Sequence, residues 1–337
     1  MAKSLEDGKA ELAAVLEGTG FAGLTDRAFL RITGTDAARW LNGMVTNAIQ
    51  GLAPGDGCYN FLLNAQGRIQ GDCTVYRETV GDSAEFLLAT SGAQVEAIQE
   101  HLERFIIMDD VELTRAYREE TGLLILGAKA ATVMNGLGLP TLDPLRLAHA
   151  DTEHGPVLLL SPTEGSVERF ELRAATATMD GLTAALRRDS EVVEVCADTL
   201  EWLRLLEGTP LFGRDIRERD LPQETAQDRA LHFAKGCYLG QEIVERIRSR
   251  GQVHRRFMAF RLTGEQPATL PAALEAGGKP AGEITSAAVI PTPEGPILAA
   301  LGYARREALD SGQALSYVGG TATSRTALPH GHRASKD

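Results

Sequence analysis

The sequence has no long apolar run and few aromatic residues. No stretch of its 337 residues approaches the roughly 18 consecutive apolar residues of a membrane helix, so we expect no membrane partner. Aromatic residues make up only 5% of the chain and the net charge is −12, so we expect no direct binding of nucleic acid. The first residues carry acids and no basic end before an apolar stretch, so we expect no secretory signal and a cytoplasmic protein.

Cysteine is also scarce, and its four copies lie far apart. Cys58, Cys73, Cys196 and Cys237 form no Cys-x-x-Cys pair, so free thiols are expected rather than a disulfide framework. The spacing of the seven histidines does not predict a metal site. The apolar or strand-like surroundings of Cys58, Cys73 and Cys196 indicate that these three side chains fill space in the interior.

Strand and helix patterns are mixed through most of the chain. Residues 28–34 alternate like a half-buried strand, residues 58–64 and 68–77 are typical of a β-hairpin, and residues 95–105 repeat apolar side chains at helical spacing. After Arg256, short strands separated by glycine and proline predict a small all-β barrel or sandwich. We therefore expect an α+β protein with antiparallel sheets.

These patterns also predict the domain organisation. Residues 1–255 are expected to form one α+β region, built from two interleaved subdomains of roughly 1–110 and 111–255. Residues 256–327 are expected to form the β-barrel-like domain. Residues 328–337, LPHGHRASKD, are polar and predict a disordered tail.

Residues 234–251, AKGCYLGQEIVERIRSRG, are the most informative stretch for function. Leu239, Ile243 and Ile247 are four apart and predict one buried face of a helix. Such a face would anchor the helix to the core. Other residues of the stretch are candidates for a reactive or ligand-binding site.

Cys237 is expected just before or within the first turn of that helix. Unpaired backbone N–H groups, the helix dipole and the cation of Lys235 would all favour a thiolate there. Gly236 and Gly240 remove side-chain bulk on both sides, so a backbone or a ligand can approach closely. The alternative is a buried cysteine that only fills space.

An arginine cluster follows directly. Residues 245–256 hold five arginines, at positions 246, 248, 250, 255 and 256, against one glutamate. The cluster indicates an anionic ligand or partner, and the alternative is a solvated helix end. No aromatic residue interleaves these arginines, so an RNA-binding module lacks a stacking platform.

The segment KGCYLGQE followed by Arg246 resembles the signature of YgfZ-type proteins, which are relatives of the glycine-cleavage T-protein, an aminomethyltransferase. The residues that carry this resemblance are Lys235, Gly236, Cys237, Tyr238, Gly240, Gln241, Glu242 and Arg246. ITGTDAARWLNGMVTNAI with its Thr46-Asn47 ending, LLNAQGRIQGD, and LRLLEGTPLFGRDI with LPQET are similar to further parts of the family. The resemblance implies a GcvT-like ring of three domains around a central tetrahydrofolate pocket.

The predicted hairpin departs from the T-protein pattern. T-proteins carry adjacent acids there, and a carboxylate near the folate nitrogens serves the transfer chemistry. This chain has Gly71-Asp72, so only the second acid is present. The resemblance implies Asp72 as a folate-binding residue, and the missing acid weakens the case for aminomethyl transfer.

Two more folate-binding residues are implied by the resemblance. Phe170-Glu171-Leu172 is similar to a strand whose glutamate binds the pterin edge, and Arg204 matches an arginine in the family's Leu-Arg-Ile-Glu-x-Gly stretch. Leu206 stands at the position of that stretch's glutamate, and Glu207 follows it. From the residues alone, Glu171 fits a surface strand carboxylate and Arg204 a helix-surface arginine equally well.

The resemblance implies a tetrahydrofolate-binding accessory protein in iron–sulfur cluster assembly or repair. Its partners would be cluster-assembly proteins or iron–sulfur enzymes, including tRNA-modifying ones. A cluster typically needs four thiolates, so Cys237 would act with ligands from a partner or through thiol or redox chemistry. The alternative is a folate-dependent aminomethyltransferase, which needs a positioned carboxylate and no thiol.

Overall fold

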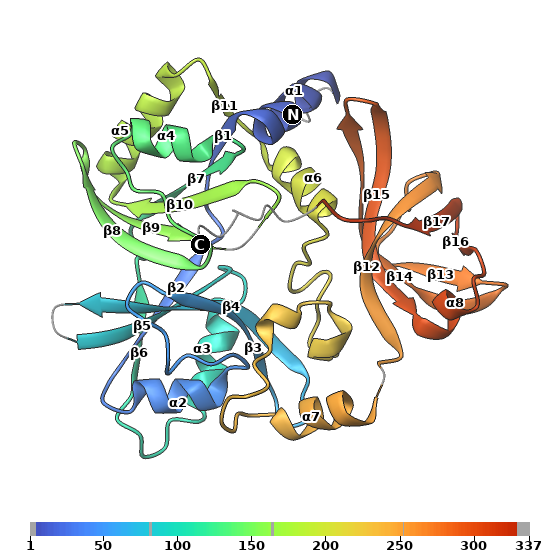
Figure 1. Cartoon of the computed structure of the whole chain (residues 1–337), viewed down its shortest axis with the longest axis horizontal. Coiled ribbons are helices and arrows are strands. Elements are labelled where there is room, and N and C mark those ends of the chain that lie inside the picture. The colour runs from blue at the N-terminus through green and yellow to red at the C-terminus, as the bar shows by residue number, and fades with distance from the viewer. Residues whose placement is uncertain (1–4, 81–82, 163–164, 252, 329–337) are drawn as a thin grey trace, which may run out of the picture.

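The structure is a computed structural model that describes residues 5–80, 83–162, 165–251 and 253–328. Two sheets with their covering helices form the body of the molecule, and a barrel lies beside them (Figure 1). The predicted disordered tail lies, from residue 329 onward, outside the described residues.

The first sheet has six strands in the order β11-β1-β7-β10-β9-β8. Its strands are β1 (Thr19–Gly23), β7 (Thr121–Gly127), β8 (Arg146–Thr152), β9 (Gly155–Ser161), β10 (Glu168–Ala174) and β11 (Val192–Glu194). Helices α4 (Ala130–Gly136) and α5 (Thr176–Arg188) cover one face, where Ile125, Phe170 and Leu172 are buried. All neighbours pair antiparallel except β1 and β11, which are parallel.

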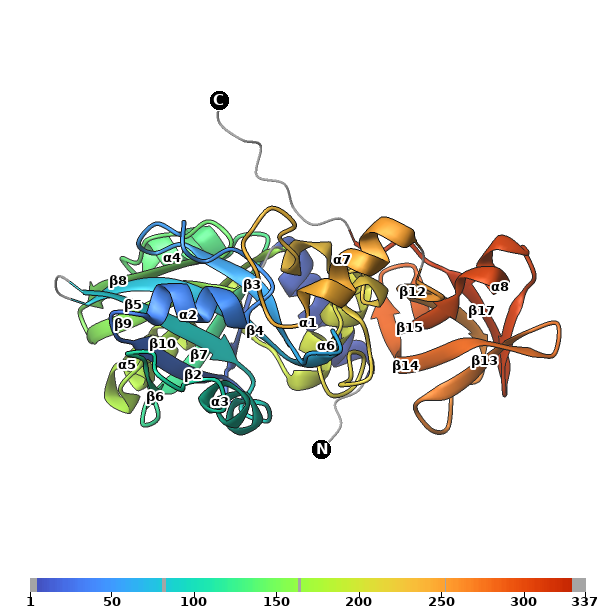
Figure 2. The same cartoon turned by 90° about the horizontal axis from the view of Figure 1, so that it is seen from below.

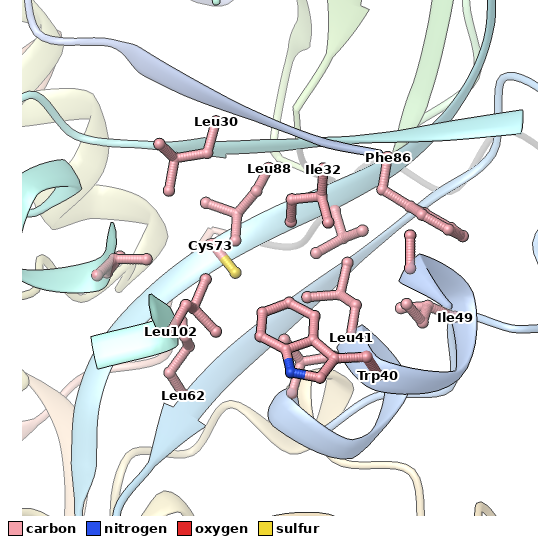
Figure 3. Packing of buried hydrophobic residues seen from close by; sticks show 14 of the residues in the cluster. Leu30, Ile32, Trp40, Leu41, Ile49, Leu62, Cys73, Phe86, Leu88 and Leu102 are labelled. Carbon is pink, nitrogen blue, oxygen red and sulfur yellow. The ribbon is translucent and has the colours of Figure 1, made fainter. Parts of the chain in front are cut away.

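The second sheet has five strands in the order β3-β4-β5-β2-β6. Its strands are β2 (Ala28–Thr33), β3 (Gly57–Leu63), β4 (Ile69–Val80), β5 (Ser83–Thr90) and β6 (Glu112–Ala116). Helices α2 (Ala37–Met44) and α3 (Val95–Glu103) cover its outer face, where Trp40, Leu41 and Cys73 meet in one core (Figure 3). The predicted hairpin is therefore confirmed as β3 and β4, and Cys73 fills space as expected.

The inner faces of the two sheets pack against each other. Phe29, Tyr76 and Leu87 of the second sheet meet Leu158 and Leu160 of the first in one buried cluster. Because side chains alternate along a strand, the residues between these point outward to the helices. The polar residues of this inner layer are consequently the ones placed to form a site.

A closed barrel follows in the chain, as the sequence predicts. Its strands are β12 (Arg255–Gly264), β13 (Ala272–Ala276), β14 (Lys279–Thr292), β15 (Gly295–Arg305), β16 (Leu315–Tyr317) and β17 (Gly320–Ser324), with the short helix α8 (Arg306–Asp310) after β15. Helices α1 (Leu5–Glu17) and α6 (Ala197–Glu207) lie between the barrel and the first sheet (Figure 2). Leu12 and Leu205 from these helices pack against Phe257 and Tyr303 of the barrel.

The chain between α6 and the barrel forms the centre of the molecule. It contains the 3₁₀ turns η1 (Pro222–Glu224) and η2 (Asp228–Ala230), followed by α7 (Gln241–Arg250). In Figure 1 this segment runs between the two sheets and the barrel. The expected α+β fold with a C-terminal barrel is thus present.

Candidate functional site

A cavity of about 300 Å³ lies between the inner faces of the two sheets, α6 and the 209–229 segment. Asp72, Glu171 and Arg204 all line it, so the structure brings together three residues that are far apart in the sequence. Cys237 is not among the residues that line this cavity. The thiol and the cavity are therefore separate features that share one central segment.

Strand alternation explains why charged side chains of β10 face the cavity. Glu171 pairs across the sheet with Leu124, and Arg169 pairs with Leu126. Cross-strand partners share a face, and all four of these residues line the cavity. Phe170, between the two charged residues, points into the helix-covered core instead.

Glu171 is held by an arginine inside the cavity. The Nε atom of Arg27 donates to Glu171 Oε2 at 2.9 Å, and a second guanidinium nitrogen donates to Oε1. Glu171 is 5% exposed, so it is not the surface strand carboxylate that the residues alone allow. Burial opposes the charge of Arg27, but the adjacent carboxylate of Glu171 holds the pKa of Arg27 above its ordinary value.

Asp72 accepts hydrogen bonds from two side chains. The Tyr59 hydroxyl donates to Oδ2 at 2.7 Å, and Gln94 Nε2 donates to Oδ1 at 2.8 Å. Burial and the neighbouring carboxylate of Asp72 raise the pKa of Tyr59 well above its ordinary value, so the hydroxyl remains a donor. Asp72 is thus a fixed acceptor at the wall of the cavity.

Arg204 lines the cavity, but its donors are used within the protein. It donates to both carboxylate oxygens of Glu201, to Asp215 Oδ2 at 2.6 Å, to the Thr209 carbonyl and to Ser286 Oγ. Its side chain is 14% exposed, so it is not a helix-surface arginine. Arg204 joins α6 to the following loop and to the barrel.

Glu207 is a cavity residue that the family pattern does not identify. It is 3% exposed and accepts from the Ser166 N–H at 2.7 Å, the Ser166 hydroxyl at 2.6 Å and Arg169 at 2.6 Å. The signal for it is helical spacing, because Glu207 follows Arg204 by three residues and so shares its face of α6. Tyr59, Arg27 and other cavity residues have no such local signal.

The structure corrects the expected start of the signature helix. Helix α7 begins at Gln241 and is capped by Gly240, which has φ of 82°. Cys237 is therefore three residues before the cap and outside the first turn, although its side chain is exposed as a reactive thiol requires. Only glycine fits at position 240, because an added Cβ would lie 2.6 Å from the Asn64 carbonyl oxygen.

Lys235 does not point its charge toward the thiol as expected. Its ammonium donates to the backbone carbonyls of Asn42, Val45 and Asn47 at 2.7, 2.7 and 2.6 Å. The same atom lies 5.0 Å from the centroid of the Tyr238 ring. Burial lowers the pKa of Lys235 to about 8.

The predicted buried face of the helix is also shifted. Leu239, Ile243 and Ile247 are half-buried, whereas Tyr238 and Val244 are buried in a cluster with residues of the hairpin. Val244 is the buried residue on this side of the helix, and Ile243 packs over Gly67 at the hairpin turn.

Three of the remaining signature residues form hydrogen bonds within the protein. Gln241 Oε1 accepts from the Tyr238 N–H at 3.3 Å, and Glu242 pairs with Arg246 at 2.8 Å on the exposed side of α7. Gly236 is exposed, and an added Cβ would meet nothing within 4 Å. Of the two signature glycines, only Gly240 allows a close backbone approach.

The described arginines of the cluster have different surroundings. Arg248 pairs with Glu245 and lies 4.3 Å from the centroid of the Phe233 ring, while Arg255 binds Asp220 beside the barrel. Arg256 is exposed on the other side of β12. Arg246, Arg248 and Arg255 thus each pair with a carboxylate of the chain, and an anionic partner at the cluster stays a prediction.

Other features of the described chain bear on the class of protein. All four cysteines are free thiols, with Cys58 and Cys73 buried and Cys196 half-buried, so the prediction of free thiols is confirmed. Within the described ranges, no three His, Cys, Asp or Glu side chains are grouped to hold a metal ion. None of the described helices has the length and apolar character needed to cross a bilayer.

Two packed sheets and a closed barrel define a GcvT-like fold, with a cavity between the sheets. Residues 3–235 match the GCVT N-terminal domain family, so the chain belongs to that family. The crystal structure of the glycine cleavage system aminomethyltransferase T from Bartonella henselae has the same fold, with a TM-score of 0.82 at 21% identity. The match covers 96% of this chain and 89% of that one.

The chain is similar to two kinds of curated protein. It is 28% identical over 252 residues to the mitochondrial iron–sulfur cluster assembly factor IBA57 homologue of Pyricularia oryzae, covering 71% of this chain, and 26% identical over 293 residues to that of Neosartorya fischeri, covering 81%. It spans only 56% and 63% of the length of those relatives. The aminomethyltransferase of Exiguobacterium sibiricum is 25% identical, over 84% of this chain and 78% of the relative. The YgfZ assignment within the family stays a prediction.

Proposed function

We propose that this protein is a tetrahydrofolate-binding accessory factor in the assembly or repair of iron–sulfur clusters, and that Cys237 acts on the cluster together with ligands from a partner. The observation that carries the proposal is that one chain combines a cavity lined by charged side chains with an exposed thiol in the family signature. The similarity to iron–sulfur cluster assembly factors supports the cluster role. Client enzymes, tRNA-modifying ones included, and a cytoplasmic location remain predictions from the sequence.

The cavity has the chemistry that a pterin ring requires. Its volume of about 300 Å³ is at the lower end of ordinary ligand pockets. A pterin presents two N–H donors along one edge, and the buried carboxylate of Glu171 has acceptor sites for both beyond the two that Arg27 occupies. Asp72 would face the reduced ring from the opposite sheet. When bound, tetrahydrofolate would serve as a carrier of one-carbon units.

The exposed thiol fits a role with a partner better than a role alone. Cys237 is the one cysteine that the described structure leaves exposed, and a cluster needs more thiolates than one residue provides. The neighbouring residues His232, Phe233 and Gly236 are also exposed, so a partner's ligands can approach the sulfur. The cluster would thus be cargo of the complex and not a group held by this chain alone.

The proposal is tested by Cys237→Ser in cells that lack the native protein. We expect folding and folate binding to be retained, since the side chain is exposed and outside the cavity, while the activity of iron–sulfur enzymes is not restored. Cys196→Ser, which removes a half-buried thiol beside α6, is the matched control and is expected to restore activity. Full restoration by Cys237→Ser would show that the thiol has no role.

A folate-dependent aminomethyltransferase is the second candidate. Similarity to aminomethyltransferases over most of the chain favours it, whereas Gly71 in place of the first acid disfavours it. Purified protein mixed with tetrahydrofolate and an aminomethyl-loaded lipoyl protein separates the two functions. Formation of methylene-tetrahydrofolate would establish the transferase, and the accessory role predicts none.

A further inference from the structure

Two family motifs that are nearly 190 residues apart form one structural unit. Residues 42–47, at the end of α2 and directly after it, are hydrogen-bonded to the segment 229–239 at several points along its length. The His232 N–H donates to the Thr46 carbonyl at 3.2 Å, and the Leu239 N–H donates to the Gly43 carbonyl at 3.0 Å. The segment that carries Cys237 is therefore fixed on both sides of the exposed thiol.

Asn47 connects this unit to the cavity. Its side-chain amide donates to the carbonyls of Arg229, at 2.9 Å, and Tyr59, at 3.2 Å. Both of these residues line the cavity, and the Arg229 guanidinium lies 5.0 Å from the centroid of the Tyr59 ring. Movement of the cavity wall at these two residues therefore acts directly on Asn47.

Lys235 connects the same residue to the thiol segment. The Asn47 carbonyl accepts from the Lys235 ammonium at 2.6 Å, and two further carbonyls from the end of α2 hold that ammonium in place. The carbonyl end of a helix favours a cation, which adds to these three bonds. Cys237 follows Lys235 by two residues, so the position of the lysine sets the position of the sulfur.

We propose that Asn47 and Lys235 are positioning residues that hold the Cys237 thiol relative to the cavity, so that a ligand bound against Tyr59 and Arg229 changes the reactivity of the thiol. The inference rests on the proposed folate site and adds a connection between it and the thiol. A ligand that stacks on Tyr59 or pairs with Arg229 restrains the carbonyls that Asn47 binds. Asn47 passes this restraint to Lys235, because the Asn47 carbonyl accepts from the Lys235 ammonium.

The test measures alkylation of Cys237 by iodoacetamide with and without 5-formyltetrahydrofolate, in a Cys196→Ala background. We expect saturating ligand to slow alkylation by roughly fivefold, the lower end of ordinary coupling between sites. In Lys235→Met the affinity for the ligand should stay unchanged, because Lys235 does not line the cavity, but alkylation should no longer respond to the ligand. Lys279→Met, on the exposed surface of the barrel, should behave like the wild type.

The outcomes separate this inference from the proposed function. Binding without any change in the alkylation rate would overturn the inference alone, as would a Lys235→Met variant that still responds. Absence of binding to the wild type would overturn both. If Lys235→Met does not fold, Lys235→Gln takes its place, and its shorter amide is expected to leave at most a weak response.

Discussion

Two of the carboxylates that line the cavity are neutralised by arginines. Glu171 is bound by Arg27, and Glu207 is bound by Arg169 and Ser166. A buried carboxylate without a partner is costly, so each of the two is held by an arginine, with further acceptor sites left for a ligand. A ligand that offers paired N–H donors to Glu171 is therefore selected over one that offers acceptors.

Glu171→Ala is expected to weaken binding of reduced folate by at least roughly tenfold, because a hydrogen bond to a charged group contributes about 1.5–3 kcal/mol. Isothermal titration of the purified variant checks this. Glu275→Ala removes an exposed strand glutamate from the barrel and is the control, with an unchanged dissociation constant expected. Equal affinity of both variants and the wild type would show that Glu171 does not contact the ligand.

Arg204 illustrates a different role for a residue at the same cavity. Its guanidinium binds Glu201, Asp215 and Ser286, and Asp215 is completely buried. Asp215 also accepts from the hydroxyl of Ser286 at 2.7 Å. The family resemblance identifies the position of Arg204, whereas its contacts indicate that it mainly holds α6 against the barrel.

At the scale of elements, the β3–β4 hairpin and the start of α7 lie in close contact at Gly240. An added Cβ there would lie 2.6 Å from the Asn64 carbonyl oxygen, and φ of 82° disfavours any residue with a side chain. Gly240→Ala should therefore destabilise the protein by roughly 2–3 kcal/mol in urea unfolding.

Gly236→Ala is the matched control for that substitution. An added Cβ at Gly236 would meet no atom within 4 Å, so we expect a change within about 0.5 kcal/mol. A Gly240→Ala variant as stable as Gly236→Ala would mean that the loop before α7 rearranges without cost. The position of the exposed thiol then would not depend on this contact.

Elements with a regular pattern are predictable from the sequence, and those fixed by distant contacts are not. Alternation identifies the hairpin and the short strands identify the barrel, because both patterns are local. The start of α7 depends on the approach of Asn64, which no local pattern contains. Helix α1 has a similar dependence, since its buried Glu11 accepts from Thr199 at 2.7 Å and from the Cys196 N–H at 2.8 Å.

Some residues of the candidate site are likewise predictable from the sequence, and others are not. Asp72, Glu171 and Arg204 follow from the family resemblance, and all three line one cavity. Arg27 and Tyr59 come from other strands or loops, and only the packing of the two sheets brings them there. The contacts of Lys235 with the end of α2 are equally non-local.

At the scale of the whole molecule, a second polar cluster joins the two sheets. Glu78 of β4 is 1% exposed and accepts from His149 of β8 at 2.7 Å and from the Tyr117 hydroxyl at 2.9 Å. Arg31 and Glu120 are the other charges that act on His149. His149 is thus the side chain through which the first sheet holds Glu78.

The pKa values of this pair predict how the sheets respond to pH. The hydrogen bond that His149 donates to Glu78 raises the pKa of His149 above its ordinary value of 6.5. Burial alone would raise the pKa of Glu78, but its bonds with His149 and Tyr117 hold it below the ordinary 4.5. The stabilisation from His149 is therefore fully present below pH 6.5 and is lost as the pH rises through its raised pKa. The contribution of Glu78 is present above pH 4.5 and is lost as the pH falls through its lowered pKa.

His149→Gln is expected to remove the loss of stability above pH 6.5 that this pair produces. Urea unfolding of wild type and variant at about pH 5.5 and about pH 7.5 isolates the contribution, because other titrating groups are common to both proteins. The wild type should exceed the variant by more at the lower pH, since His149 is charged there and binds the carboxylate between the sheets. Glu78→Gln should abolish the same difference, because a neutral amide gives the protonated imidazole no opposite charge to bind. A constant difference between wild type and His149→Gln at both pH values would mean that the sheets are held together by their apolar layer alone.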